Sequence, residues 1–404
     1  MLSGRNVYLC GKGGTGKSLV SKIFIKKMEE LGKTVMVAAP SGLAAFSIGG
    51  STIHSMLKMN ASKIYKKCER PSSKSLDVLK DVDCVLIDEC GMLRIDHFVY
   101  LTNCIKAIEK KYYKHIQLVI VGDFLQLPPV VTQKERMELE RAYGKKMLYQ
   151  AYEDKCAWDK NHFKVCCLKK NRRQVNDEFA NMMDLTRTGD VVATSYFERF
   201  EQDNSYYLED GYVHLCAYRK DVNRINNHIV SKHQNDESYK EFEATLKSGN
   251  WTEKNSHMQR EAFYVGMPVM AIVNTERGFK NGSMGTITKV CDKSVCVRFL
   301  GMDKDIRVCM STFREGNVTI KQIPLVPAYA VTIHKCQSQT FDKVVVHQGM
   351  FEEGQAYVAL SRVKTPEGLV ICGHIKDKDI ERPMLKDIST NCGLEASELN
   401  EIFG

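Results

Sequence analysis

An eight-residue stretch near the beginning of the chain limits the folds that it can adopt. Residues 11–18 read Gly-Lys-Gly-Gly-Thr-Gly-Lys-Ser and match the pattern G-x-x-x-x-G-K-S/T in full. A strand-like run, Asn6–Cys10, precedes the stretch, and apolar residues at helical spacing follow it as far as Leu31. In this context the backbone N–H groups of a glycine-rich loop converge on phosphate oxygens. The stretch therefore predicts an α/β fold with a phosphate-binding loop, and the simpler alternative is a glycine-rich turn without a ligand.

This loop and a second strand predict a nucleotide site. Lys17 would reach the β- and γ-phosphates of ATP, and the Ser18 hydroxyl would ligate Mg²⁺. The apolar run Val85–Ile87 ends in two carboxylates, of which Asp88 is placed to hold Mg²⁺ and Glu89 to polarise the attacking water. Two exposed acids at a strand end are the alternative for that pair. The remaining positions that we expect to bind the nucleotide are Gly11, Gly13, Gly14, Thr15 and Gly16.

Short apolar runs alternate with helical patterns through the first half of the chain. Such alternation predicts a mostly parallel sheet covered by helices. A second set of strand candidates lies near 212–218, 328–331, 344–347 and 369–372. The candidates of the first half are Asn6–Cys10, Thr34–Ala39, Cys84–Ile87, Gln117–Val121 and Phe163–Leu168.

Two segments interrupt the second set. Residues 232–262 are polar and poor in strand signals, so they predict a loop or an irregular insertion. Residues 264–324 contain the apolar runs Pro268–Val273, Gly285–Thr288 and Ser294–Phe299, separated by turn signals at 281–282 and 292–293. This pattern is typical of a small antiparallel barrel inserted into a larger domain.

The overall composition narrows the class of protein only slightly. The 58 Lys and Arg residues against 49 Asp and Glu residues give a net charge of +9, which suits a polyanionic partner but occurs equally in other proteins. The 15 cysteines include no C-x-x-C pair, which favours a reduced protein without a zinc site. No run approaches the roughly 18 apolar residues of a membrane span, and no signal peptide is evident. We therefore expect a soluble, intracellular protein that does not enter a membrane.

A third apolar run, Leu118–Val121, leads into a polar turn that contains Gln126 and two prolines. A glutamine at the carboxyl end of a strand beside a phosphate loop can sense the γ-phosphate and relay its loss to a neighbouring domain. Taken alone, the segment is only a strand and a turn.

Seven segments stand in a fixed order along the chain. They are GKGGTGKS, APSGLAAFSIGGSTIHS, LIDECGM, VGDFLQLPPV, LKKNRRQ, AYAVTIHKCQSQT and YVALSRVK. The ordered set resembles the petite-integration-frequency (Pif) helicases, the 5′→3′ branch of helicase superfamily one. Matching segments span residues 5–374, and RecD-like helicases share much of the set.

The resemblance implies two RecA-like domains, residues 1–165 and 166–404, with ATP in the cleft between them. It also implies that segment 264–324 is an SH3-like barrel that grips the nucleic acid strand. A short insertion at about 56–80 in the first domain would meet a duplex junction. There Lys63, Lys66 and Lys67 would contact phosphates, and Met56, Leu57, Met59 and Ile64 could supply an apolar wedge. A solvated linker helix is the alternative for this insertion.

The resemblance assigns two arginines to the nucleotide. Arg173 fits the fourth motif and Arg362 the last motif, and in the family both reach across the cleft to the γ-phosphate. A guanidinium there stabilises charge on the transferring phosphoryl group, an effect of roughly 10³–10⁵ in rate. A surface salt bridge is the alternative for either residue, and Arg172 stands where the family usually has an aromatic residue. With Glu89 and Gln126, the two arginines complete the expected catalytic set.

The resemblance also implies contacts to a single strand. Backbone amides and hydroxyls at these positions would hold phosphates without reading bases. Buried structural histidines are the alternative for His54 and His334. The expected contacts are Pro40, Ser41, Gly42, Thr52 and His54 in the first domain, and Thr332, His334 and Lys335 in the second.

Two features depart from the family pattern. The family carries a glutamine upstream of the phosphate loop that recognises adenine, and no glutamine occurs in Met1–Cys10. The usual serine and glycine of the fifth motif are Cys336 and Ser338, and a serine restricts positive φ at that loop. We expect relaxed nucleotide selectivity or an N-terminally shortened form from the first departure, and altered nucleotide coupling from the second.

The sequence as a whole predicts an ATP-dependent motor that acts as a monomer. It would move 5′→3′ along single-stranded DNA and unwind duplex at junctions between single and double strands. The alternatives are a nucleotide-dependent single-strand-binding switch or ATPase that does not unwind duplex, and a motor that acts mainly on RNA. A small-molecule P-loop kinase is a third class, but it would leave the fifth and last motifs unexplained.

Overall fold

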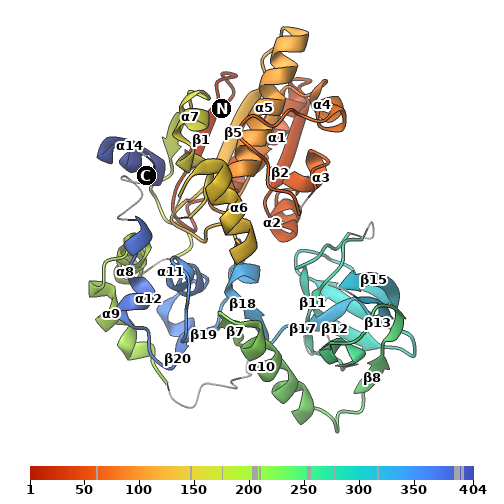
Figure 1. Cartoon of the computed structure of the whole chain (residues 1–404). Helices are drawn as coiled ribbons and strands as arrows, with labels where there is room; N and C mark the ends of the chain where they lie inside the picture. Colours follow the sequence, from red (N-terminus) through yellow and green to blue (C-terminus); the bar gives the residue numbers. More distant parts are fainter. Residues whose placement is uncertain are drawn as a thin grey trace.

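The computed structural model describes residues 1–404 except 61, 146–147, 175, 203–207, 209–210, 253–255, 276–277, 316–317, 386–391 and 393–394. Two parallel sheets flanked by helices lie one above the other in Figure 1, and an antiparallel β unit stands beside the second sheet. This arrangement confirms the predicted α/β class. Among the described residues, no helix is both long enough and apolar enough to cross a membrane.

The first sheet has six strands in the order β3-β2-β4-β5-β1-β6, and all of its pairings are parallel. Every residue of β4 and β5 is buried, because helices cover both faces of the sheet. That burial explains why these strands read as continuous apolar runs. The strands are β1 Val7–Cys10, β2 Val35–Ala39, β3 Ser51–Thr52, β4 Cys84–Ile87, β5 Gln117–Gly122 and β6 Lys164–Cys167.

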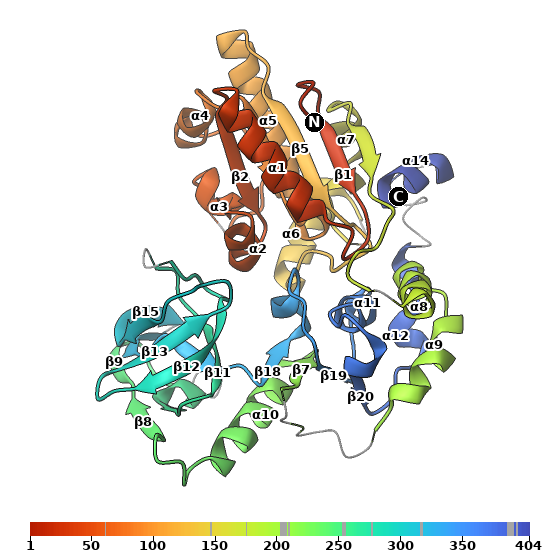
Figure 2. The ribbon, with the colours of Figure 1, turned by 180° about the vertical axis from the view of Figure 1, so that it is seen from behind.

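Alternate residues of these strands enter two separate cores. Tyr8 and Ile120 pack with helix α5 (Ile95–Tyr112), whereas Leu9 and Val121 pack with helix α1 (Lys17–Glu30). Figure 1 shows α5 on the near face of the sheet, and Figure 2, seen from behind, shows α1 on the opposite face. The other helices of this half are α2 Gly42–Ser47, α3 Ile53–Met56, α4 Ser73–Leu79, α6 Gln133–Tyr143 and α7 Lys155–Asp159.

The second sheet has four parallel strands in the order β18-β7-β19-β20. They are β7 Val213–Cys216, β18 Ala330–Thr332, β19 Val344–His347 and β20 Leu369–Cys372. One face packs with α8 (Asp177–Thr188), α9 (Val192–Phe197) and α11 (Gln355–Leu360), and α10 (Arg219–Lys232) covers part of the other face. The remaining helices are α12 Asp377–Ile380 and α14 Ala396–Phe403.

The C-terminal helix α14 returns to the first half of the molecule (Figure 1). Ile402 is buried in the core of the first sheet, and the Tyr8 hydroxyl donates a hydrogen bond of 2.8 Å to its carbonyl. The predicted division of the chain at 165/166 therefore runs through β6, and the last helix packs on the first sheet. The domain limits themselves stay a prediction.

The antiparallel unit contains three small sheets. Five strands form the order β14-β13-β12-β11-β17, three form β15-β16-β9, and two form β10-β8. Assignment of this unit to the SH3-like class stays a prediction. The strands are β8 Lys240–Glu243, β9 Thr245–Ser248, β10 Arg260–Phe263, β11 Pro268–Ala271, β12 Met284–Val290, β13 Ser294–Phe299, β14 Ile306–Cys309, β15 Ser311–Glu315, β16 Val318–Gln322 and β17 Leu325–Pro327.

Segment 232–262 was predicted to be a loop or an irregular insertion; the loop alternative was wrong, because β8 and β9 lie within the segment and β10 begins in it. In β8 only Phe242 is buried, and charged residues surround it in the sequence. All four residues of β9 are exposed. Edge strands of this kind bury too few side chains to leave an apolar pattern in the sequence.

The predicted apolar wedge in the 56–80 segment was also wrong. Met56, Leu57 and Met59 are only 5%, 0% and 9% exposed and belong to the core of the first sheet. Two of the lysines in the segment are paired: Lys63 with Glu69, and Lys67 with Asp154 at 2.9 Å. Apolar character alone could not separate residues that enter the core from residues that face a duplex.

Candidate active site

The phosphate loop lies between β1 and α1, as the sequence predicted. Gly14 and Gly16 have φ angles of 83° and 93°, and Gly16 is the N-cap of α1. A Cβ added at Gly14 would lie 2.5 Å from the Arg173 Cβ, so glycine is required there. No side chain among the described residues caps the first-turn amides of α1. These amides and the positive end of the helix dipole therefore suit an anion.

The two carboxylates follow β4 at the same edge of the sheet. Asp88 is 5% exposed, and its Oδ1 accepts a 2.9 Å hydrogen bond from the Glu89 amide. Burial, and then the charge of Glu89, raise the pKa of Asp88 above its ordinary value. A bound cation would offset the free-energy cost of burying the Asp88 carboxylate in its charged form. The Ser18 hydroxyl lines the same cleft, and a hydroxyl and a carboxylate are the hard oxygen ligands that Mg²⁺ accepts alongside water and phosphate.

A cleft of about 450 Å³ brings most of the predicted site together. Its walls come from the carboxyl edge of the first sheet and from segments that precede or belong to the second sheet. Of the predicted positions, Gly11 and Thr15 do not line it; the Thr15 hydroxyl instead donates to the Lys12 carbonyl at 2.9 Å. The cleft is lined by Gly13, Gly14, Gly16, Lys17, Ser18, Leu19, Asp88, Glu89, Gln126, Arg172, Arg173, Ser338, Thr340, Arg362 and Lys364.

Both predicted arginines lie at the phosphate loop. A Cβ added at Gly13 would lie 3.4 Å from the Arg173 Nη1 and 3.6 Å from the Arg362 Nη2. Arg362 is 1% exposed, and its Nε donates to the Val358 carbonyl at 2.8 Å. Burial, and then the charge of Arg362, lower the pKa of Arg173 to about 9. The burial of Arg362 is incompatible with a surface salt bridge, and this buried cation beside the half-buried Arg173 suits an anionic ligand.

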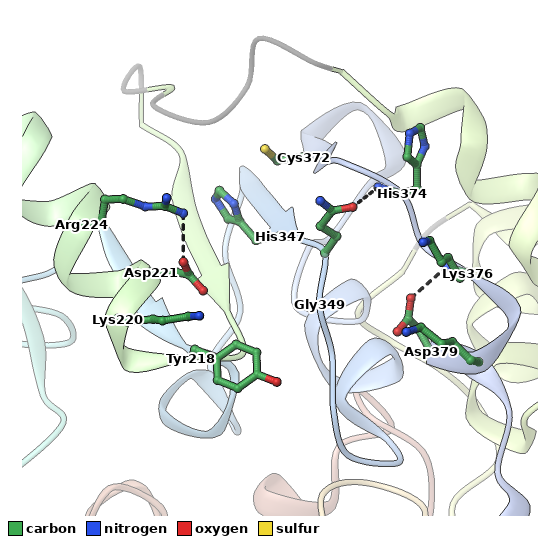
Figure 3. Close-up of a pocket in the computed structure, with 12 residues that line it drawn as sticks. Tyr218, Lys220, Asp221, Arg224, His347, Gly349, Cys372, His374, Lys376 and Asp379 are labelled. Carbon is green, nitrogen blue, oxygen red and sulfur yellow. Dashed lines mark hydrogen bonds and ion pairs between the residues drawn. The ribbon is translucent and has the colours of Figure 1, made fainter.

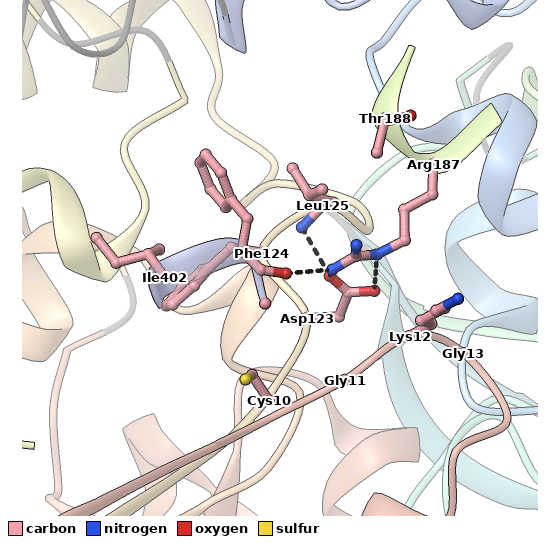
Figure 4. Close-up of polar contacts among 12 residues, drawn as sticks. Cys10, Gly11, Lys12, Gly13, Asp123, Phe124, Leu125, Arg187, Thr188 and Ile402 are labelled. Atoms are coloured by element: carbon pink, nitrogen blue, oxygen red, sulfur yellow. Dashed lines mark hydrogen bonds and ion pairs between the residues drawn. The ribbon is translucent and has the colours of Figure 1, made fainter. Parts of the chain in front are cut away.

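Three contacts between the phosphate-loop region and the second half of the chain were not foreseen. The Tyr357 hydroxyl accepts a 2.8 Å hydrogen bond from the Gly13 amide. Lys12 pairs with Asp184 of α8. Asp123 accepts two hydrogen bonds from Arg187 of α8, from Nε at 3.0 Å and from Nη2 at 2.8 Å (Figure 4). Tyr357 and Asp123 stand inside recognisable segments, but nothing in their sequence context pairs them with these partners.

The predicted strand contacts occupy the ends of β2, β3 and β18. The Ser41 and Thr52 side chains cap α2 and α3, each accepting a backbone amide at 3.3 Å, and Pro40 and Gly42 flank Ser41. Thr332, His334 and Lys335 lie at the end of β18 and in the 3₁₀ turn Ile333–Cys336. A Cβ added at Gly282 would lie 3.0 Å from the Leu43 Cβ, so the antiparallel unit approaches α2 beside Gly42.

The two predicted histidines are both half-buried. The His54 ring stands edge-on to His97 with centroids 4.4 Å apart, and burial, then the charge of Arg94, lower its pKa. His334 Nε2 lies 3.1 Å from the Glu352 Oε2. Each histidine thus has a partner and an exposed part, and their role in strand contact stays a prediction.

A second cavity of about 410 Å³, which the sequence did not predict, opens at the carboxyl edge of the second sheet (Figure 3). Its lining residues follow or end β7, β19 and β20, and the gap between β7 and β19 is the position at which α/β sheets with this strand order form a crevice. Lys220, Lys376 and Lys378 line it, and Arg224 pairs there with Asp221 at 2.9 Å. The cavity shares no lining residue with the nucleotide cleft.

Comparisons with known proteins agree with this geometry. The family model described as PIF1-like helicase matches residues 1–195. The ATP-dependent DNA helicase Pif1 of Campylobacter jejuni is 27% identical, over 91% of this chain and 88% of that protein. The ATP-dependent DNA helicase PIF1 of Danio rerio is 28% identical over 91% of this chain, which spans 58% of that longer protein. A crystal structure of Bacteroides Pif1 bound to ssDNA has a TM-score of 0.78 at 27% identity, covering 96% of this chain and 94% of that one. A structure of the Bacteroides Pif1 helicase with ADP-AlF3 and ssDNA has a TM-score of 0.77 at 26% identity, covering 96% and 93%.

Proposed function

The chain belongs to the PIF1-like helicase family, and from this premise we propose that it is an ATP-dependent DNA helicase that moves 5′→3′ and unwinds duplex. The observation that supports the proposal best is the single cleft that holds the phosphate loop, the Asp88–Glu89 pair and both arginines. A cleft whose walls come from two sheets changes shape when the sheets move, which is how nucleotide turnover can drive movement along a strand.

In this proposal the first sheet binds the nucleotide. The amides of the phosphate loop hold the phosphates, and Lys17 neutralises their charge. Its Nζ donates to the Gly11 and Lys12 carbonyls and is therefore already held at the mouth of the loop. Mg²⁺, when bound by Ser18 and Asp88, supplies positive charge at the β- and γ-phosphates.

Side chains from both halves of the chain complete the site. Arg173 and Arg362 stabilise negative charge on the transferring phosphoryl group, and Glu89 orients the attacking water. Gln126 is 5% exposed in the wall of the cleft, where it reports the γ-phosphate to the facing sheet. The arginines are held by neutral oxygens, Arg173 through a 3.0 Å bond to the Ser361 carbonyl, so their charge remains available to the nucleotide.

A single strand would cross both sheets at the ends of β2, β3 and β18. Hydroxyls and helix N-termini there bind phosphates without reading bases, which a motor that accepts any sequence requires. The antiparallel unit beside α2 would hold the strand against this surface. Closure of the cleft on ATP and its opening after hydrolysis would then change the spacing of the two groups of contacts.

The proposal is tested by unwinding of duplexes that carry either a 5′ or a 3′ single-stranded tail, with ATP and Mg²⁺. We expect unwinding of the 5′-tailed DNA only, dependence on ATP, and its loss when Mg²⁺ is chelated. ATP hydrolysis without unwinding of either substrate would favour the switch alternative. Stronger stimulation of hydrolysis and unwinding by RNA substrates than by DNA would favour an RNA motor.

A further inference from the structure

The carboxylate of Glu89 is held from the facing sheet. The Ser338 hydroxyl donates a hydrogen bond to its Oε1, and the Gln337 side-chain amide donates to its Oε2 at 3.1 Å. These partners lie 249 and 248 residues further along the chain. Both oxygens of the carboxylate are thus oriented by one dipeptide of the second half.

The backbone on both sides of this contact is in the left-handed region. Glu89 has φ 54° and ψ 48°, and Ser338 has φ 67°. For residues other than glycine this conformation costs free energy, and they keep it only where contacts with the surrounding structure hold the backbone in place. A glycine at 338 would take the same φ without cost but would carry no hydroxyl. The serine therefore supplies a donor to Glu89 at a position where the backbone alone favours glycine.

Gln337 is oriented towards the same carboxylate. Its side chain is 5% exposed, and its Oε1 is buried without a hydrogen-bond partner among the described residues. A carboxylate accepts hydrogen bonds, so only the amide nitrogen can face it. The buried side chain thus directs its donor to Glu89, and its acceptor has no hydrogen-bond partner among the described residues.

The dipeptide is joined to the predicted strand-binding turn. Ile333–Cys336 forms that turn, which carries His334 and Lys335, and Gln337 follows it directly. The Cys336 thiol donates to the Ile333 carbonyl at 3.1 Å, which holds the turn closed on itself. A shift of the turn would therefore move both donors relative to Glu89.

We propose that Ser338 and Gln337 are positioning residues for ATP hydrolysis, which orient the Glu89 carboxylate towards the attacking water when the second sheet is docked on the first. The proposal rests on the proposed function, because it assigns these residues to the same hydrolytic site. Neither residue touches the reacting phosphate; each acts through Glu89.

Three substitutions test the proposal in the full chain. Ser338→Ala removes the hydroxyl and keeps the strained backbone, whereas Ser338→Gly removes the hydroxyl and relieves the strain. Gln337→Leu removes the second donor at similar volume. We expect kcat for ATP hydrolysis with saturating single-stranded DNA to fall about tenfold in each variant, with KM for ATP within about twofold of wild type. The matched control is Ser195→Ala, which changes an exposed serine of α9 whose hydroxyl donates to the Val192 carbonyl at 3.2 Å, and it should leave both constants unchanged.

The outcomes separate this inference from the proposed function. A wild-type protein that hydrolyses no ATP overturns the proposed function. An active wild type with unchanged kcat in the Ser338 variants and in Gln337→Leu overturns only the positioning role. If Ser338→Ala hydrolyses ATP slowly and Ser338→Gly hydrolyses it at the wild-type rate, the effect comes from backbone strain. If the variants hydrolyse ATP faster than wild type in the absence of DNA, the contact restrains hydrolysis instead of supporting it. Both results contradict the proposal, as does a parallel loss of ATP binding.

Discussion

Removal of the Arg187 guanidinium should destabilise the protein strongly. Arg187 and Asp123 are 6% and 2% exposed, and their two hydrogen bonds span from α8 to the end of β5 (Figure 4). Arg187 also donates to the Phe403 carbonyl at 2.6 Å, so one side chain joins three parts of the fold. Removing one partner of a buried ion pair costs about 3–5 kcal/mol, because the other charge remains buried without compensation. At an unfolding entropy of about 2.1 cal/mol/K for each of the 404 residues, this cost corresponds to a fall in Tm of about 4–6 °C for Arg187→Met.

The pH dependence of this loss follows from the pKa of Asp123. Burial raises that pKa, but the charge of Arg187 and its hydrogen bonds outweigh burial, and the pKa is held below its ordinary value. In the wild type this contribution to stability is therefore present above the ordinary carboxyl pKa and is lost as the pH falls through the lowered one. In Arg187→Met burial dominates and the Asp123 pKa rises, so the folded variant takes up a proton and gains stability as the pH falls. The difference in Tm between the two proteins should narrow from pH 8 to pH 5.

Thermal melts followed by circular dichroism at both pH values measure the effect. The matched control is the double variant Asp123→Leu/Arg187→Met, which removes both charges and should recover most of the lost stability. A fall in Tm of less than about 2 °C in Arg187→Met, or a gap that widens at pH 5, would refute the reasoning.

Four further substitutions separate nucleotide binding, hydrolysis and proton uptake. Lys17→Ala should weaken both ATP binding and hydrolysis, whereas Glu89→Gln should retain binding measured with a fluorescent nucleotide and lose hydrolysis by orders of magnitude; near-normal turnover would remove Glu89 from the mechanism. Arg362→Ala should reduce kcat by roughly 10³-fold or more with ATP still bound, and a change confined to KM would assign the residue to ground-state binding. Burial, then the charge of His214, lower the pKa of His347 to about 3, so stability should fall by about 1.4 kcal/mol per unit as the pH drops below about 6.5. His347→Asn should flatten that part of the curve of Tm against pH, and an unchanged slope would contradict the assignment.

Much of this protein could be predicted from consecutive residues. The phosphate loop could be predicted directly, because the glycines, the lysine and the serine that would bind the nucleotide are neighbours in the sequence. The strands β4, β5 and β19 could be predicted to within a residue or two, since burial on both faces requires a continuous apolar run. The Asp88–Glu89 pair follows from the same rule, because residues just beyond a buried parallel strand meet at one edge of the sheet.

Other features of the protein are decided only by its tertiary structure. The apolar residues Met56, Leu57 and Met59 would read the same in the sequence whether they faced a core or a partner, and only their packing in the core of the first sheet decides that they are buried. The strand β9 exposes every side chain, so its pairing with β16 left no pattern to read. The spacing of residues in the sequence predicts contacts within one helix or strand. Contacts between two elements depend on how those elements pack, which the spacing does not contain.

The catalytic surroundings show the same division most clearly. Glu89 could be predicted as the residue that orients water, but its partners Gln337 and Ser338 could not, because they lie 248 and 249 residues away. The same holds for Tyr357, which meets Gly13 across 344 residues. These contacts exist because two separately folded sheets dock with their carboxyl edges facing one another. The docking is set by the summed burial of whole surfaces and by pairs such as Asp123–Arg187, and no short segment of sequence contains that information.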